Sequence, residues 1–197
     1  MLFKYPKNYA YLFLLLLGLI SCDAIDDIMP DKKDTGVISA MLNGAPFEAE
    51  GGKGLLASEF IKAELDFNEN NYLLTVYGIR IEDNKTVLAV GFQLAGKDIK
   101  EVKAGDTFTE WILINESTST FEGAKGAVEK RNSIRSDDNV FKASTYYTGE
   151  MSLTISQIDL EEQKISGTFM FSAVDSDNDT LVNVTGGAFE QVQWKVL

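Results

Sequence analysis

The chain has 197 residues, with 30 acidic and 18 basic side chains, and its formal net charge at pH 7 is −12. A body this acidic repels nucleic acid, which excludes DNA and RNA as expected partners. Histidine is absent and cysteine occurs once, which removes histidine-dependent hydrolase mechanisms and any disulfide within the chain. The sequence therefore favours a protein that is not an enzyme, although carboxylate chemistry stays open.

Residues 1–21 have the order of a secretory signal peptide. Lys4 and Lys7 precede an unbroken apolar run over residues 9–20, twelve residues long. A positively charged start followed by a short apolar run is typical of such a signal. A membrane-spanning helix needs about 20 apolar residues, so the run is too short for a permanent span. We expect residues 1–21 to be removed from the mature chain.

Residues 19–22, Leu-Ile-Ser-Cys, close the apolar run and contain the single cysteine. This tetrapeptide resembles the lipobox of bacterial lipoproteins. The resemblance implies transfer of a diacylglyceryl group to the Cys22 thiol, cleavage before Cys22, and acylation of the new amine with a fatty acid such as palmitate. One acyl chain binds a membrane reversibly, whereas several on one residue anchor it stably. The alternative is an ordinary signal peptide followed by an incidental cysteine.

Residues 22–35 form the expected tether between lipid and domain. The stretch is rich in aspartate and has few large apolar side chains, so we expect a disordered linker. The cysteine is followed by three acidic residues, Asp23, Asp26 and Asp27. Their position resembles that of the acidic residues that direct Bacteroidetes lipoproteins to the cell surface. The resemblance implies a lipid-anchored outer-membrane protein displayed outside the cell. A periplasm-facing orientation is the alternative.

Residues 36–197 are expected to form a single all-β domain. Apolar residues recur at every second position, as they do in strands with one buried face. The expected fold is an antiparallel β-sandwich or a partly closed barrel of about 8–10 strands. Strands are expected at 36–42, 46–50, 61–67, 72–82, 88–94, 107–115, 140–148, 151–156, 164–174 and 180–194.

Two phrases of the C-terminal half support an exported β protein. Residues 165–169, Ile-Ser-Gly-Thr-Phe, and residues 186–189, Gly-Gly-Ala-Phe, flank a polar turn. They resemble the corresponding strands of uncharacterised Bacteroidetes lipoproteins, as does the opening strand with its turn at Asn43-Gly44. This resemblance implies an exported protein with a β fold, and it does not imply a particular reaction.

Asp175, Asp177 and Asp179 place carboxylates at alternating positions, as the first ligands of a calcium loop do. The pattern then departs from that loop, because Thr180 stands where glycine is needed and Gly186 where a bidentate glutamate is needed. The sequence predicts weak calcium binding at most and no other cofactor. A solvated hairpin tip between two strands is the alternative.

Lys125, Lys130, Arg131 and Arg135 concentrate positive charge within residues 121–139. This stretch has no clean strand pattern, and we interpret it as a long loop. Such a loop is a candidate for binding an anionic glycan or phosphate. Acidic neighbours weaken the field, and a loop without a ligand is the alternative.

The function expected from these features is that of a membrane-anchored, non-catalytic binding or envelope-accessory module. Its expected partners are the membrane, through the lipid, and a glycan or an envelope protein. Four aromatic residues are candidates for stacking on sugars, with packing as the alternative: Trp111, Trp194, Tyr146 and Tyr147. Packing is favoured for the tryptophans, and of the adjacent tyrosines we expect one to face outward. One rival is a lipocalin-like carrier closed around an apolar cavity. The other is a carboxylate-dependent glycosidase, which needs two acidic side chains about 5 to 9.5 Å apart.

Overall fold

The computed structural model describes residues 35–51, 59–68, 71–83, 85–115, 120–133 and 139–197. The expected signal peptide, Cys22, the acidic residues Asp23, Asp26 and Asp27, and Arg135 lie outside these ranges. Thirteen strands and a single-turn 3-10 helix make up the elements, which confirms the all-β class. They are β1 (Val37–Leu42), β2 (Ala45–Glu50), β3 (Glu59–Asn68), β4 (Asn71–Glu82), β5 (Thr86–Gly96), η1 (Ile99–Glu101), β6 (Thr107–Phe108), β7 (Trp111–Asn115), β8 (Thr120–Arg131), β9 (Asn139–Ser144), β10 (Met151–Asp159), β11 (Lys164–Val174), β12 (Leu181–Gln193) and β13 (Lys195–Val196).

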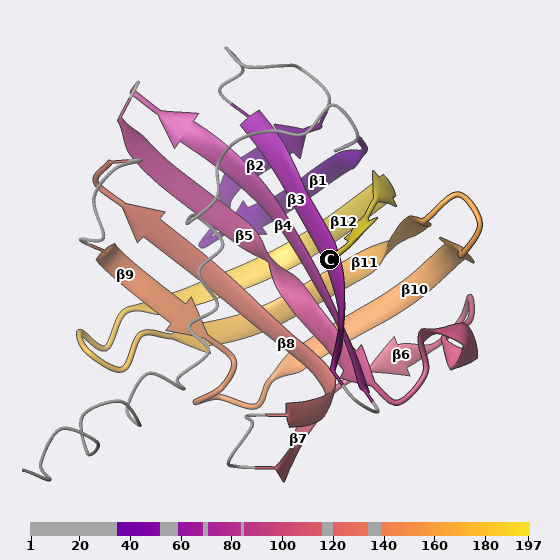
Figure 1. Ribbon diagram of the computed structural model, residues 1–197. Coiled ribbons are helices and arrows are strands. Elements are labelled where there is room, and N and C mark those ends of the chain that lie inside the picture. The colour runs from indigo at the N-terminus through magenta and orange to yellow at the C-terminus, as the bar shows by residue number, and fades with distance from the viewer. Residues whose placement is uncertain (1–34, 52–58, 69–70, 84, 116–119, 134–138) are drawn as a thin grey trace, which may run out of the picture.

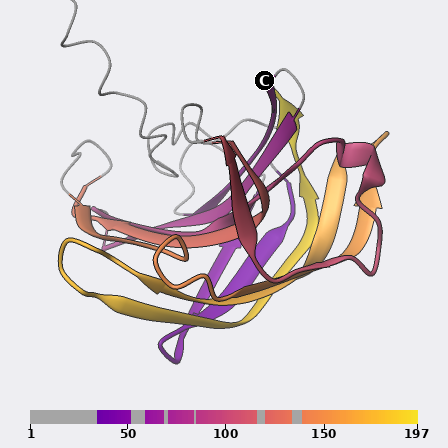
Figure 2. The ribbon, with the colours of Figure 1, turned by 90° about the horizontal axis from the view of Figure 1, so that it is seen from below.

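The strands form one sheet that is folded into two facing layers (Figure 1, Figure 2). The first layer has the order β3-β4-β5-β8-β9, with β13 beside β3 and β7 beside β8; the second has the order β10-β11-β12-β1-β2, with β6 beside β10. A single pair, Ser144 with Val174, joins β9 to β11 and carries the ladder from one layer to the other. The sheet stays open, without a closed barrel, which is consistent with a sandwich.

Aromatic rings from both layers fill the space between them. The ring centroid of Phe92 on β5 lies 4.9 Å from that of Phe189 on β12 and 5.8 Å from that of Phe169 on β11. All three side chains are almost fully buried. The period-two pattern produces this core, because every second side chain of a strand points to the same side.

Strand β8 is the main departure from the sequence prediction. The interpretation of 121–139 as a long loop is wrong for its first part, because Thr120–Arg131 is a strand that pairs with both β5 and β9. The strand carries small residues where the layers approach closely: a Cβ atom on Gly126 would lie 2.4 Å from the ring of Phe171 on β11. Because these side chains are small, the period-two alternation of apolar and polar residues that identifies a strand is not visible in this stretch.

The expected strand at 107–115 is two strands, because the chain changes layer there. β6 pairs with β10 in the second layer, whereas β7 pairs with β8 in the first. Upstream, η1 and a loop lead from the end of β5 to β6, and Ile99 and Val102 are buried in the main core. Residues 97–110, here called the crossover, therefore connect the layers at one end of the sandwich.

The outer face of the first layer also buries side chains. Arg131 Nε lies 2.6 Å from Glu129 Oε1, and the two side chains are 4% and 2% exposed. In the ladder these residues stand opposite Val87 and Ala89 of β5. The ion pair is thus enclosed next to a second apolar cluster, which consists of Phe60, Tyr77, Ile79, Val87, Ala89 and Ala127.

Candidate functional site

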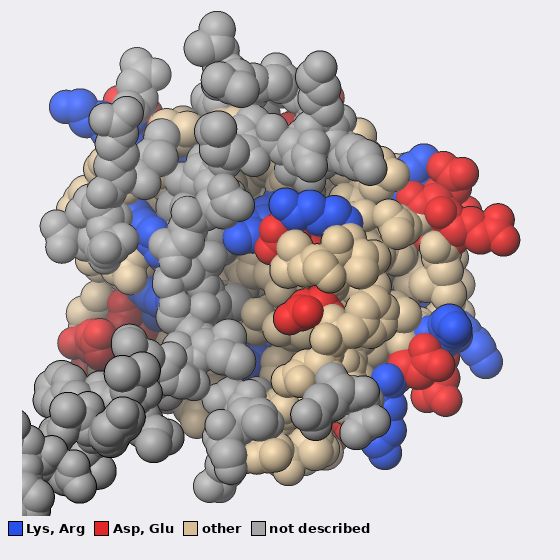
Figure 3. Space-filling view, viewed as in Figure 1, with Lys and Arg blue, Asp and Glu red and all other residues tan. Residues whose placement is uncertain are grey.

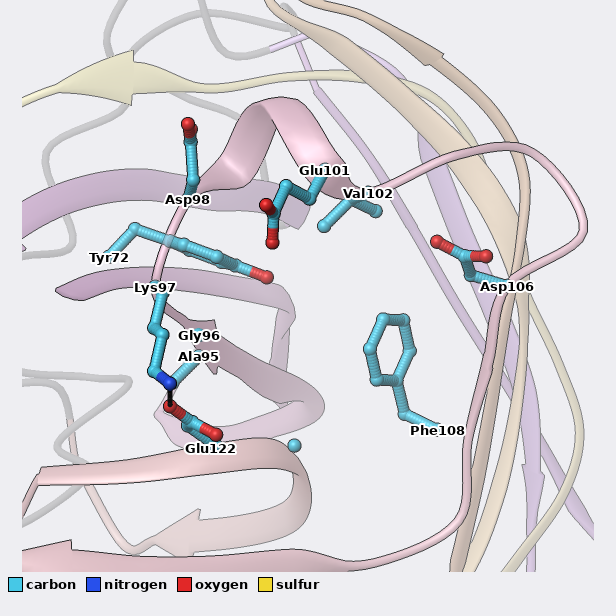
Figure 4. A pocket seen from close by; sticks show the side chains of 11 residues that line it. Tyr72, Ala95, Gly96, Lys97, Asp98, Glu101, Val102, Asp106, Phe108 and Glu122 are labelled. Carbon is cyan, nitrogen blue, oxygen red and sulfur yellow. Dashed lines mark ion pairs between the residues drawn. The ribbon is translucent and has the colours of Figure 1, made fainter.

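A pocket of about 430 Å³ lies beside the crossover (Figure 4). Small-molecule sites commonly have volumes of about 300–1,000 Å³. Charged side chains of both signs gather near this end of the molecule, at the right-hand margin over β6 and the β10–β11 hairpin (Figure 3). The pocket is lined by Tyr72 of β4, Ala95 and Gly96 of β5, Lys97, Asp98, Glu101, Val102 and Asp106 of the crossover, Phe108 of β6, and Glu122 and Gly123 of β8.

Tyr72 is the buried polar residue of the pocket, with a side chain 3% exposed. It stands opposite Gly96 in the β4–β5 ladder. A Cβ atom on Gly96 would lie 3.1 Å from the ring, so the glycine lets the ring lie close over β5. The hydroxyl points into the pocket (Figure 4), and no described residue forms a hydrogen bond with it. The ring is buried while the hydroxyl opens on the pocket, where it is available to a ligand.

Two of the four carboxylates in the wall are fixed by the backbone. Asp98 is the N-cap of η1 and accepts a hydrogen bond from the backbone N–H of Lys100 at 2.9 Å. Asp106 accepts one from the backbone N–H of Lys103 at 2.8 Å. These bonds hold the crossover in a defined shape beside the sheet, since aspartate side chains bind nearby backbone groups in turns.

The other two carboxylates are Glu101 and Glu122. Glu101 points into the pocket together with the Tyr72 hydroxyl (Figure 4), and its carboxylate has no protein partner in the described ranges. Glu122 lies 3.9 Å from Lys97 Nζ, a side chain that is 77% exposed. The wall thus holds an excess of negative charge around one hydroxyl.

Burial raises the pKa of Tyr72 well above its ordinary range. The negative charges of Asp106, Asp98, Glu101 and Glu122 raise this pKa further, in that order of influence. The hydroxyl therefore stays protonated at physiological pH. It can donate one hydrogen bond and accept others.

The acidic wall is not arranged as a metal centre. In the part of the chain that the structure describes, no group of three His, Cys, Asp or Glu side chains could hold a metal ion. Val102 and Phe108 add apolar surface to the lining. A few polar groups with apolar neighbours are what a site for an organic molecule needs.

An aromatic cluster, consisting of the half-buried Trp111 and the exposed Tyr146 and Tyr147, lies next to the pocket, whereas Trp194 is buried in the core. The rings of Trp111 and Tyr146 stack with centroids 5.0 Å apart, and Tyr147 meets Tyr146 edge-on at 5.1 Å. The two tyrosines are 54% and 58% exposed. They lie in the turn after β9, so both point outward and the alternation expected for a strand does not apply. Trp111 stands opposite Gly123, and the aromatic cluster meets the pocket at that residue.

Comparison with known proteins points to one family. Residues 102–193 are similar to the domain of unknown function DUF6252. The match spans just under half of the chain, from the crossover to the end of β12. No curated protein and no solved structure matches. Within the described ranges, the search for helices able to span a membrane found none.

The described basic residues of the predicted anion site all lie in the DUF6252 match, but the structure does not bring them together. Lys125 Nζ lies 3.8 Å from the ring centroid of Phe121. Lys130 Nζ lies 3.6 Å from Glu82, while Arg131 is buried in its ion pair. Because alternate residues of β8 face opposite sides of the sheet, Lys130 is separated from the other two. These residues form no common surface for an anion.

The three aspartates of the predicted calcium site also lie in the DUF6252 match, at the turn between β11 and β12. The two carboxylate oxygens of Asp175 accept hydrogen bonds from the backbone N–H groups of Lys142 at 2.7 Å and Asp177 at 2.8 Å. They do not form a three-ligand group with Asp177 and Asp179. The geometry corresponds to the alternative interpretation, a hairpin tip, with Asp175 connecting it to β9.

Sequence reasoning missed the pocket, because its wall comes from four strands, β4, β5, β6 and β8, together with the crossover. A usable signal is present in the connection after β5. Ile99 and Val102 interrupt a run of charged residues over 97–106, and both are buried. Apolar side chains at such spacing in a charged connection indicate a segment packed on the core.

The Glu82→Gln substitution is expected to destabilise the fold at neutral pH only. Glu82 accepts a hydrogen bond from Arg80 at 2.6 Å. This bond lowers the pKa of Glu82, partial burial opposes the shift, and the charges of Arg80 and Lys130 reinforce it. A carboxyl whose folded pKa is lowered stabilises the fold above its unfolded pKa, and this contribution is lost as pH falls through the folded pKa.

We expect the substitution to lower the free energy of unfolding by about 0.5–1 kcal/mol at neutral pH. The difference from wild type should shrink as the pH is lowered through the folded pKa of Glu82. Urea denaturation at several pH values measures it. A loss that is the same at all pH values would contradict the assignment.

Proposed function

We propose that this chain is a lipid-anchored, non-catalytic binding module of the bacterial envelope. Cys22 carries the lipid, residues 22–35 are the tether, and the sandwich binds a ligand in the pocket beside the crossover. The binding role is supported by one observation above others. The hydroxyl of the buried Tyr72 side chain, without a described protein partner, faces a space of about 430 Å³.

The proposed location is the outer membrane, with the domain displayed on the cell surface. This part rests on the lipobox-like residues 19–22 and on Asp23, Asp26 and Asp27 directly after them. The aromatic cluster, whose two tyrosines are exposed, supports a glycan or an envelope protein as a further partner, because Tyr and Trp present large amphipathic surfaces at interfaces.

The fold bears on the first rival function, the lipocalin-like carrier, and the pocket bears on the second, the glycosidase. A lipocalin-like carrier needs a closed barrel around an apolar cavity, but the sheet is open and apolar side chains from both layers pack between them. The glycosidase remains the second candidate, because four acidic side chains line one pocket. Release of reducing sugar from a glycan by the purified chain would favour this candidate over the proposal.

The Cys22→Ala substitution is expected to release the protein from the membrane. Without the thiol, no diacylglyceryl group can be attached. The lipid is the means by which we propose that the acidic domain is attached to the membrane. Cells fed a labelled fatty acid should yield labelled wild type in the membrane fraction. The variant should carry no label and should appear in soluble fractions. Label on the variant, or wild type found free of membranes, would refute the anchor.

A matched variant separates anchoring from surface display. Replacing Asp23, Asp26 and Asp27 together by asparagine keeps Cys22 and removes only the acidic signal. This variant should keep the lipid label and the membrane fraction, but lose cleavage by protease added to intact cells. Unchanged cleavage would show that the three aspartates do not direct display.

A further inference from the structure

We infer that the pocket binds an organic cation, an ammonium group carried by a small molecule, with Glu101 and the Tyr72 hydroxyl as its contacts. This deepens the proposed binding role and rests on it. Two independent features of the pocket support it: the balance of charge in its wall, and the hydroxyl of a buried tyrosine that opens on its interior.

The charge balance favours a positive ligand. Four carboxylates line the pocket against a single lysine. That lysine, Lys97, is largely exposed and lies 3.9 Å from Glu122. Opposite charge is therefore attracted to the pocket and anionic ligands are repelled.

The Tyr72 hydroxyl is the second feature. Its ring is enclosed between β5 and the crossover, and the hydroxyl end reaches the same space as the Glu101 carboxylate (Figure 4). No described residue satisfies it. An ammonium group has three N–H donors, which can reach both the hydroxyl and the carboxylate. The face of an aromatic ring also attracts a cation nearby.

The form of the wall favours an organic cation over a metal ion. Calcium and magnesium need several oxygens at about 2.0–2.6 Å from one point, and the described acidic side chains do not converge in that way. Val102 and Phe108 offer apolar surface to a carbon skeleton. A volume of about 430 Å³ has room for more than a bare ion.

The test is calorimetric titration of the full lipidated chain in a nonionic detergent, at low salt and slightly acidic pH. The probes are two amines with their neutral counterparts: glucosamine with N-acetylglucosamine, and cadaverine with 1,5-pentanediol. We expect at least one amine to bind and its neutral counterpart not to bind. The amine that binds distinguishes an amino sugar from an aliphatic amine as the source of the ammonium group.

Substitutions with opposite expected signs separate ligand contact from structural damage. Glu101→Gln should weaken binding about tenfold, because it removes a charged hydrogen-bond acceptor. Tyr72→Phe should weaken it about three- to tenfold by removing only the hydroxyl. Lys97→Gln should tighten it about two- to fivefold by removing an exposed positive charge. Glu48→Gln, on an exposed position of β2 outside the pocket lining, is the matched control and should not change the affinity.

Gly96→Leu fills the space in front of Tyr72. This variant distinguishes the claim that the pocket binds a ligand from the claim that the ligand is an organic cation. If a neutral counterpart binds as tightly as its amine and Gly96→Leu abolishes both, the binding role stands and the cation inference fails. If no probe binds, or if Glu48→Gln weakens binding as much as Glu101→Gln, the inference is overturned as well. Amine binding that survives Gly96→Leu would overturn both the site and the ligand class.

Discussion

Replacing Arg131 by methionine should lower the free energy of unfolding by about 3–5 kcal/mol, because it removes the guanidinium that pairs with the buried Glu129 carboxylate. The Arg131 guanidinium also donates to Asn139 Oδ1 at 3.2 Å. Methionine fills similar volume, so little of the loss should come from packing. Urea denaturation followed by circular dichroism measures the change. A loss below about 1 kcal/mol would mean that water reaches the pair.

The double variant Glu129→Leu with Arg131→Met is the matched test of the cause. Replacing both members of a buried pair by apolar residues is often neutral or stabilising. We therefore expect the double variant to recover most of the stability that Arg131→Met loses. The exposed Lys85→Met, which removes the same charge from a turn, should change stability little. Failure of the double variant to recover would point to a cause other than the loss of this ion pair.

Truncation of Phe92 to alanine is expected to destabilise the sandwich by about 3–5 kcal/mol. The side chain is fully buried and contacts Phe169 and Phe189 of the opposite layer. Its removal loses both burial and the ring contacts between the layers, and the strands cannot close the cavity without shifting. Met170→Ala on β11, a side chain 55% exposed, is the control and should cost far less. Similar losses for the two variants would contradict this account of the core.

The sequence predicts the strands whose faces differ in polarity. β3 and β10 alternate apolar and polar residues, and each forms close to its expected place. The prediction for β8 was wrong because contact with the other layer determines the residues on its inner face. Position 126 is a glycine because the ring of Phe171 from the other layer occupies the space where a side chain would lie. Local alternation carries no information about such an approach.

The pocket could not be predicted for a related reason. Tyr72 and Gly96 meet only through the β4–β5 ladder, and Glu101 reaches them only because the crossover folds back at the end of the sandwich. In the sequence, each of these residues has an ordinary interpretation. Tyr72 is an aromatic residue in a strand, Gly96 ends a strand, and Glu101 lies in a charged connection. The basic residues singled out by composition are instead used in separate contacts along β8.

The boundary of the DUF6252 match cuts through cooperating parts of the molecule. β8 pairs with β5 along nearly its whole length, and β12 pairs with β1, yet β1 and β5 lie outside residues 102–193. Tyr72 and Glu101, the proposed ligand contacts, are outside it too. The matched segment is thus a fragment of a folding unit. Relatives recognised through it alone can differ in half of the binding wall, and hence in what they bind.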